Sequence, residues 1–242
     1  RHRLEKKYPE KEISEPVEPI IYYLDNGTPE PVKSALIEGA LWWNEAFEKI
    51  GYKDAFQVKI LPDEADPLDV RYNVIQWVHR STRGWSYGAS VINPLTGEIL
   101  KGHVSLGSLR VRQDYMIFQG LSKEPFRESN SNDKILELSL DRIKQLSAHE
   151  VGHTLGFAHN FASSTNSRSS VMDYPHPLLS YKDDRIIFEN VYDKGLGKWD
   201  LLSVEYAYSN NSDLEKIASK ANSKDLRYIS DNYARHKNSA HP

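Results

Sequence analysis

Three histidines and one glutamate stand at short, fixed intervals in residues 149–159, which read HEVGHTLGFAH. His149 and His153 are four residues apart, so in an α-helix both imidazoles lie on one face and can reach a single ion. Glu150 follows the first histidine, and its carboxylate can reach a water on that ion without being a ligand itself. The pattern predicts a metal site with a general base beside it.

The third histidine requires a change of chain direction. Gly156 can adopt the positive φ that ends a helix abruptly, and the turn would bring His159 to the ion from another side. Three nitrogen ligands leave a fourth position open for water or substrate, which is typical of catalytic zinc. We therefore expect a hydrolase with one Zn²⁺ held by His149, His153 and His159. Chance would produce these five specified positions on the order of once in 10⁴ sequences of this composition.

The elements that must position these residues can be predicted from hydrophobic periodicity. A helix over residues 134–157 would carry the first two ligands, with its apolar residues packed against a sheet. These apolar residues are Ile135, Leu138, Ile143, Leu146, Val151 and Leu155. Residues 121–133 before it are polar and predict an irregular loop.

The rest of the chain predicts a partly parallel sheet. The expected order is a strand at 20–24, a helix capped by Thr28 with Pro29 in its first position, and strands at 56–61 and 70–78. Residues 87–92 and 99–106 predict a hairpin, and one of its strands would form the sheet edge. Residues 174–192 predict an irregular wall beside the site, and residues 199–208 a C-terminal helix.

Length and composition suggest one domain with an appendage, because 242 residues of 39% hydrophobic content can bury a sizeable core. We expect residues 1–19 to be an extended lead-in, 20–208 the catalytic domain, and 209–242 a polar C-terminal segment that begins a further region of a longer chain. The tail histidines His2, His236 and His241 are expected to be exposed to solvent.

Charge and composition also exclude several functions. A net charge of −3 provides no electrostatic footprint for nucleic acid. No apolar run approaches 18 residues, so a membrane span is not expected in this chain. The chain has no cysteine, so disulfides and thiolate ligands are excluded.

The 149–159 segment resembles the hallmark of the metzincin clan of zinc endopeptidases, which continues with a methionine-containing turn, the Met-turn. Residues 170–174, SVMDY, resemble that turn. The resemblance implies that Met172 forms a hydrophobic floor beneath the metal. It also implies that Tyr174, two positions later, approaches the zinc and can hydrogen-bond to the reacting oxygen.

The chain is more closely similar to a group of large bacterial zinc-dependent metalloproteases, the Met-zincin proteins. The similarity covers roughly residues 17–208 and is carried by four stretches, at residues 22–31, 69–77, 83–90 and 145–161. It implies an α+β, zincin-like catalytic domain with a twisted mixed sheet, a long zinc helix, a Met-turn and a C-terminal helix. It also implies an exported protein, located in the periplasm or secreted, and an edge strand where Ala89, Ser90 and Val91 pair with a peptide or protein substrate.

Two other functions stay open at this point. The chain could be a catalytically silent, zinc-containing module that binds peptides, although such a module has no chemical need for Glu150. It could also be a zinc amidase that acts on peptidoglycan stems or glycopeptides, because metal chemistry alone does not separate these amide bonds from those of proteins. Zinc-dependent peptide-bond hydrolysis with Glu150 as general base is the function we expect.

Overall fold

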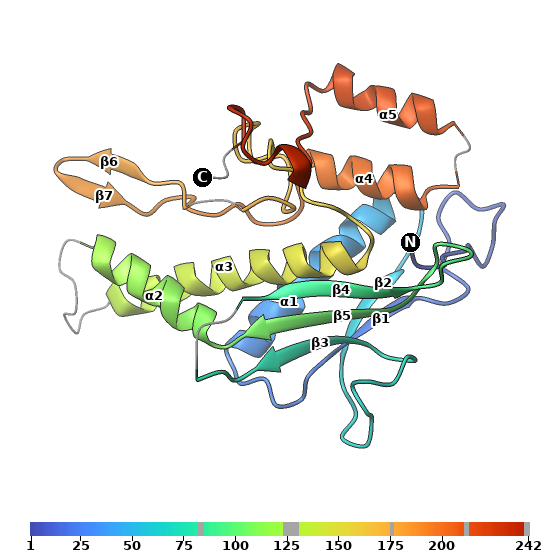
Figure 1. Ribbon diagram of the computed structural model, residues 1–242, viewed down its shortest axis with the longest axis horizontal. Helices are drawn as coiled ribbons and strands as arrows, with labels where there is room; N and C mark the ends of the chain where they lie inside the picture. The colour runs from blue at the N-terminus through green and yellow to red at the C-terminus, as the bar shows by residue number, and fades with distance from the viewer. Residues whose placement is uncertain (82–84, 123–130, 175–176, 211–212, 240–242) are drawn as a thin grey trace.

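A five-stranded mixed sheet forms the base of the molecule (Figure 1). The computed structural model describes residues 1–81, 85–122, 131–174, 177–210 and 213–239. The strands are β1 Ile20–Leu24, β2 Phe56–Ile60, β3 Asn73–Val78, β4 Tyr87–Ile92 and β5 Ile99–Gly107, in the spatial order β2-β1-β3-β5-β4. The strands β1, β2, β3 and β5 pair in parallel, whereas β4 is an antiparallel edge strand. The predicted mixed sheet, hairpin and edge strand are confirmed.

Two helices, α1 Val32–Lys49 and α3 Ser131–Thr154, pack against each other and share one hydrophobic core with the sheet. Trp43 joins them, because its indole N–H donates to the carbonyl of Ala148 at 2.8 Å. Helix α1 begins after the predicted position at Pro29, and Thr28 does not cap it. The carboxylate of Glu30 instead accepts hydrogen bonds from the backbone and hydroxyl of Ser34 in the first turn.

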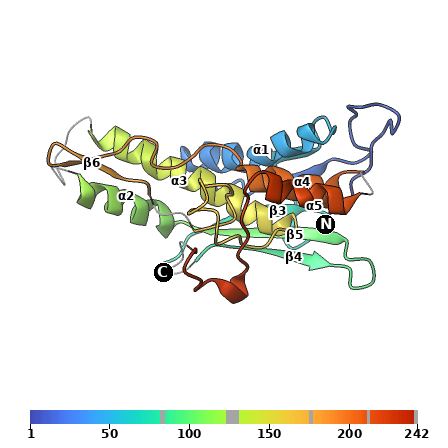
Figure 2. The same cartoon turned by 90° about the horizontal axis from the view of Figure 1, so that it is seen from above.

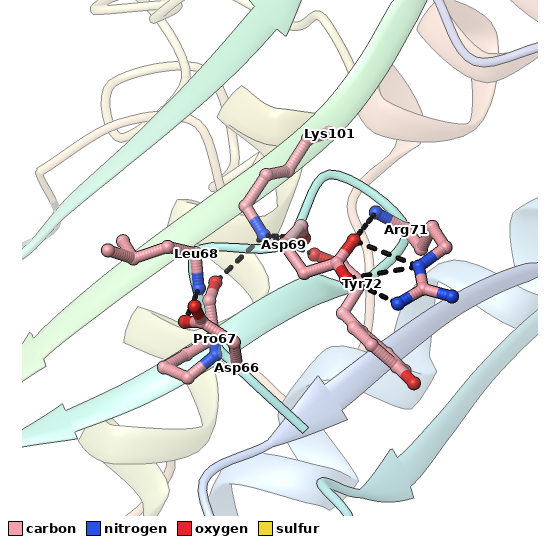
Figure 3. A network of polar contacts seen from close by, with 7 residues as sticks. All are labelled: Asp66, Pro67, Leu68, Asp69, Arg71, Tyr72 and Lys101. Atoms are coloured by element: carbon pink, nitrogen blue, oxygen red, sulfur yellow. Dashed lines mark hydrogen bonds and ion pairs between the residues drawn. The ribbon is translucent and has the colours of Figure 1, made fainter. Parts of the chain in front are cut away.

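Strand β3 begins three residues later than predicted because the preceding loop is folded around a lysine (Figure 3). Lys101 in β5 donates from Nζ to the carbonyl oxygens of Pro67 and Asp69, at 2.8 and 2.7 Å, and to that of Tyr72. The chain curves to direct these carbonyl groups at one ammonium group, and it is therefore not extended as a strand there. The loop is therefore held on the sheet by a buried cation.

Helix α2, Leu109–Leu121, was not predicted. Its buried positions include Asp114 and Gln119 beside Phe118, so the apolar periodicity that indicates a helix is absent. Asp114 is held inside by Arg110, whose guanidinium donates to both carboxylate oxygens at 3.0 and 2.7 Å. Figure 1 shows α2 alongside the N-terminal half of α3. The loop predicted at residues 121–133 falls between the two helices: its ends belong to α2 and α3, and residues 123–130 lie outside the described part of the chain.

The zinc helix α3 differs from its prediction at both ends. It begins at Ser131 and ends at Thr154, before the predicted end at Phe157, because Gly156 has a φ of 101° and turns the chain. Near its start, Ile135 and Leu138 do not pack on the sheet as expected. They lie in a second, smaller cluster with three residues of α2 and the later wall, which are Phe118, Val191 and Tyr192.

The chain after the Met-turn is more ordered than predicted. Within the expected irregular wall, β6 Ser180–Lys182 and β7 Arg185–Ile187 form a short hairpin, which extends over the N-terminal end of α3 (Figures 1 and 2). Helix α4, Lys198–Tyr208, is confirmed, and Tyr208 donates to the carbonyl of Leu155 at 2.7 Å. In the described part of the chain, none of the helices has both the length and the apolar character that a membrane span needs.

The polar C-terminal segment contains two elements that were not predicted, α5 Leu214–Ser223 and the 3₁₀ helix η1 Asp231–Tyr233. Helix α5 has apolar residues at helical spacing, Leu214, Ile217, Ala218 and Ala221, but only Ile217 is buried. Between α5 and η1, the chain hydrogen-bonds to the loop after the zinc helix, where Phe161 donates from its backbone N–H to the carbonyl of Ile229 at 2.9 Å. The proposed boundary at residue 208 stays a prediction.

The N-terminal segment also packs on the domain. His2 is 7% exposed, and its Nε2 lies 3.1 Å from the carbonyl oxygen of Thr154 and 3.2 Å from the hydroxyl of Tyr22. The expectation that His2 is exposed is therefore wrong, because backbone pairing of Arg1 with Ile99 draws this end of the chain onto the sheet. His236 is exposed as expected, and His241 lies outside the described residues.

Candidate metal centre

The three predicted ligands meet at one point in the structure. The Nε2 atom of His153 lies 3.2 Å from Nε2 of His149 and 3.1 Å from Nε2 of His159. His149 and His153 come from successive turns of α3, and His159 arrives from the loop that Gly156 initiates. The four-residue spacing in the helix and the turn at the glycine thus bring the three histidines together as the sequence predicted.

The other ring nitrogen of each histidine has an acceptor. Nδ1 of His149 lies 2.7 Å from the carbonyl oxygen of Val171, and Nδ1 of His153 lies 2.9 Å from that of Phe157. Nδ1 of His159 lies 2.7 Å from Oδ1 of Asp231. A carbonyl or carboxylate oxygen can only accept, so each neutral ring carries its proton on Nδ1.

This tautomer pattern fits a bound cation. All three Nε2 atoms present lone pairs to one another, an arrangement that is repulsive unless a positive charge lies between them. For a tetrahedral zinc ion with Zn–N distances of about 2.0–2.1 Å, neighbouring nitrogens are about 3.3 Å apart, close to the separations in this cluster. Burial lowers the pKa of His149 and His153, which keeps both rings neutral and available as ligands. The residues present therefore suit zinc.

The Met-turn fixes the first ligand through its backbone. Val171, whose carbonyl oxygen accepts from His149, is itself held by Asp200 of α4. One oxygen of that buried carboxylate accepts from the backbone N–H groups of Val171 and Gly197, at 2.9 and 2.8 Å. The other accepts from the Ser170 hydroxyl. Helix α4 therefore anchors the turn that orients His149.

Met172 packs against the ligand-bearing turn of α3, and its role as a hydrophobic floor beneath a metal stays a prediction. Met172 is 1% exposed, and it presses on Gly152, which lies between the two helical ligands. A Cβ atom at Gly152 would overlap the sulfur of Met172 and would lie 2.7 Å from Cζ2 of Trp43. The glycine is therefore required by the close approach of two large side chains to the helix.

Glu150 lies in the same cleft as the histidines and is 5% exposed. Burial raises the pKa of its carboxyl to about 7, although the charge of Arg142 and a hydrogen bond from the backbone of Gly88 oppose the shift. A carboxyl group with such a pKa can both accept and donate a proton near neutral pH. Gly88 belongs to β4, so the edge strand runs directly beside Glu150.

Tyr174 covers two of the ligands. Its ring centroid lies 4.8 Å from that of His159 and 5.4 Å from that of His149, and the side chain lines the cleft. Burial, followed by the charge of Glu150, raises the pKa of the Tyr174 hydroxyl, which therefore stays protonated and can donate. The structure thus brings Tyr174 into contact with two of the predicted ligands, and its approach to the zinc stays a prediction.

The predicted substrate strand lies at the edge of the sheet, but its cleft contacts are elsewhere. Ala89, Ser90 and Val91 do not line the cleft, whereas Tyr87 and Gly88 do. The hydroxyl of Ser90 lies instead 3.4 Å from the carbonyl oxygen of Thr154 in α3. The pairing of residues 89–91 with a peptide stays a prediction, and the structure favours contacts nearer the N-terminal end of β4.

Sequence reasoning missed three residues around the site. Asp200 and Asp231 are far along the chain from the ligands they support, and no local signal identified them. Arg142 is seven residues before His149, and this separation places both residues on one face of a helix. That spacing could have identified Arg142 as a cleft residue.

Residues 131–242 match the sequence model of the Met-zincin family. The match covers less than half of the chain, but it includes all three histidines, Glu150, the Met-turn and Asp231. The match supports a metzincin-clan, metalloprotease-like domain. It does not include the strands of the sheet, although the similarity to the Met-zincin proteins noted from the sequence begins near residue 17. No curated protein and no solved structure matches the chain.

Proposed function

We propose that this metzincin-like domain is a zinc-dependent endopeptidase in which His149, His153 and His159 hold one Zn²⁺ and Glu150 is the general base. The observation that carries the proposal is the convergence of three Nε2 lone pairs in a cleft that also contains a buried carboxyl group. A bound zinc ion would lower the pKa of a water molecule and polarise the carbonyl group of a peptide bond.

Glu150 would perform the proton transfers. Its carboxylate takes a proton from the attacking water, and the resulting carboxylic acid returns that proton to the nitrogen of the leaving amine. Without the charge of a metal, burial raises the pKa of this carboxyl to about 7, and the charge of a bound zinc ion would favour the carboxylate form that accepts the proton. The hydrogen bond from the Gly88 backbone orients the carboxylate while both transfers occur.

The cleft favours an extended peptide as substrate. Strand β4 forms one of its walls, and as an edge strand it has backbone groups that a substrate strand can pair with. In the same cleft, the hydroxyl of Tyr174 can donate a hydrogen bond to the oxygen that becomes negative during the reaction. The open cleft of about 790 Å³ accommodates several residues of a chain.

Cleavage of a diverse peptide library, followed by mass spectrometry, tests the proposal. Zinc-loaded protein should cut peptides internally, and chelation should abolish cleavage until zinc is restored. Glu150→Gln should lower the rate by about 10²- to 10⁴-fold while zinc stays bound. Glu137→Gln provides the matched control, because Glu137 is an exposed carboxylate of the same helix.

Two results would contradict the proposal. Cleavage that survives in Glu150→Gln would show that another group is the base. Zinc-loaded protein that cuts no peptide would instead be a zinc-containing binding module or an amidase of another substrate class, and incubation with peptidoglycan stem peptides separates these two.

A further inference from the structure

Arg142 is a buried cation at the candidate active site. It is 7% exposed, and it lines the same cleft as His149 and Glu150. Its Nη1 donates to Oε1 of Gln145 at 3.1 Å, and its guanidinium carbon lies 5.8 Å from the centre of the Tyr192 ring. Guanidinium groups remain protonated in proteins, so this positive charge persists despite burial.

Among the residues that the structure describes, no carboxylate forms a hydrogen-bonded ion pair with Arg142, although the nearby carboxyl groups of Asp114 and Glu150 interact with its charge. Arg110, the other arginine of the cleft, is neutralised by Asp114 through two hydrogen bonds. For Arg142 only one of five N–H donors has a protein acceptor in the described part of the chain, and that acceptor is a neutral amide. Desolvation of an unpaired charge is costly, so such a group usually has an anionic partner when it functions.

The position of Arg142 relates it to the substrate. It is seven residues before His149 on α3, which corresponds to two turns and about 10 Å along the helix axis. An extended chain advances about 3.3 Å per residue, so Arg142 is within about three substrate residues of the metal. A planar guanidinium binds a carboxylate with two parallel hydrogen bonds, which no neutral side chain can imitate.

We propose that Arg142 forms a carboxylate-binding subsite, which selects substrates with an acidic group within three residues of the scissile bond. This inference rests on the proposed function and specifies its substrate class. The carboxylate can come from an Asp or Glu side chain or from the C-terminus of the substrate. The first source makes the enzyme selective for acidic sequences, whereas the second places the cut near a chain end.

Binding measurements test the subsite without relying on turnover. All measurements use zinc-loaded Glu150→Gln protein and fluorescent alanine-rich peptide amides that carry Glu or Gln at one position, scanned along the peptide. At one or two positions Glu should improve the dissociation constant about tenfold or more over Gln. Peptides with a free C-terminus, compared with their amides, identify the second source of the carboxylate.

Substitutions of Arg142 then test whether this residue causes the preference for Glu over Gln in the peptide. Arg142→Gln should bring the Glu-to-Gln affinity ratio close to one, and Arg142→Lys should retain part of it. Gln113→Ala, which removes a neutral polar side chain from the same cleft, should retain the ratio. Circular dichroism and thermal unfolding establish that each variant is folded, and Arg142→Lys keeps the test decisive if the Gln variant does not fold.

The proposal is overturned if no acidic position binds more tightly, or if the preference persists in Arg142→Gln. Its failure is distinguishable from failure of the proposed function. If the wild-type protein cuts neutral and acidic peptides equally, the subsite proposal fails and the peptidase proposal stands. If the protein cuts no peptide and still binds acidic peptides through Arg142, the subsite proposal stands and the peptidase proposal fails.

Discussion

Asp231 lies with Oδ1 2.7 Å from Nδ1 of His159, although the two residues are 72 positions apart in the chain. A carboxylate that accepts from a histidine ligand fixes the ring orientation and makes the opposite nitrogen a stronger ligand. The segment that contributes Asp231 is also fastened to the metal loop by the side chain of Asn160, which donates to the carbonyl of Arg227 at 2.8 Å. The C-terminal segment thus completes the metal centre.

Removal of this carboxylate should weaken zinc binding. We expect Asp231→Ala to lower zinc affinity about 10- to 100-fold, because His159 loses the group that orients it. Asp231→Asn should lower the zinc affinity less, since the amide oxygen of asparagine can still accept a hydrogen bond from Nδ1 of His159. Competition with a chromogenic chelator measures both affinities. Asp225→Asn, which removes an exposed charge from the same segment, is the control, and an unchanged affinity in Asp231→Ala would refute the role.

Two glycine substitutions should have opposite effects on stability. Gly152→Ala should destabilise the protein by about 1–3 kcal/mol, because the new methyl group collides with Met172 and Trp43. Gly120→Ala in α2 should stabilise it by about 0.5–1 kcal/mol, since among the described residues no atom outside the backbone of α2 lies within 4 Å of the new carbon, and alanine favours a helix. Urea unfolding measures both. Equal effects of the two substitutions would disprove the packing argument.

A double variant locates the collision at Gly152. When Met172 is also changed to Ala, the sulfur no longer opposes the new methyl group. The loss in the free energy of unfolding for Gly152→Ala/Met172→Ala should then be smaller than the sum of the two single losses. Strict additivity would instead assign the strain to Trp43.

Burial of His2 should make the protein less stable in mild acid. Desolvation lowers the pKa of His2 from 6.5 to about 4 in the folded protein. Above pH 6.5 the His2 ring is neutral in both the folded and the unfolded protein, so its titration does not change the free energy of unfolding. As the pH falls towards 4, the unfolded chain binds the proton first, so the free energy of unfolding decreases by at most about 3 kcal/mol.

Urea unfolding at pH 7.5 and pH 5 tests this dependence in the wild type and in His2→Gln. Other titrating groups, including the metal ligands, contribute equally to both proteins, so the difference between the two pH dependences isolates His2. We expect the wild type to lose more stability on acidification than the variant. An identical loss in both proteins would contradict the burial of a neutral ring.

The zinc helix and the sheet were predictable because their signals are local. The apolar periodicity of α1, the alternation that indicated β2 and β3, and the turn between β4 and β5 depend only on residues within or next to each element. Helix α2 could not be found this way, because its buried face includes Asp114, which is tolerated there only through its contact with Arg110. Helix α5 contributes one buried residue, and the helical spacing of its apolar residues Leu214, Ile217, Ala218 and Ala221 was a local signal that sequence reasoning overlooked.

The sequence by itself determined the ligand set of this protein. His149 and His153 share a helix face by virtue of a spacing of four, and Gly156 permits the turn to His159, so eleven consecutive residues specify three ligands and a base. Only the tertiary structure decided that Asp200 anchors the Met-turn, that Asp231 orients His159 and that Arg142 enters the cleft without a hydrogen-bonded carboxylate among the described residues. These relationships depend on how separate elements pack, and no local spacing encodes a contact between residues that the fold alone brings together.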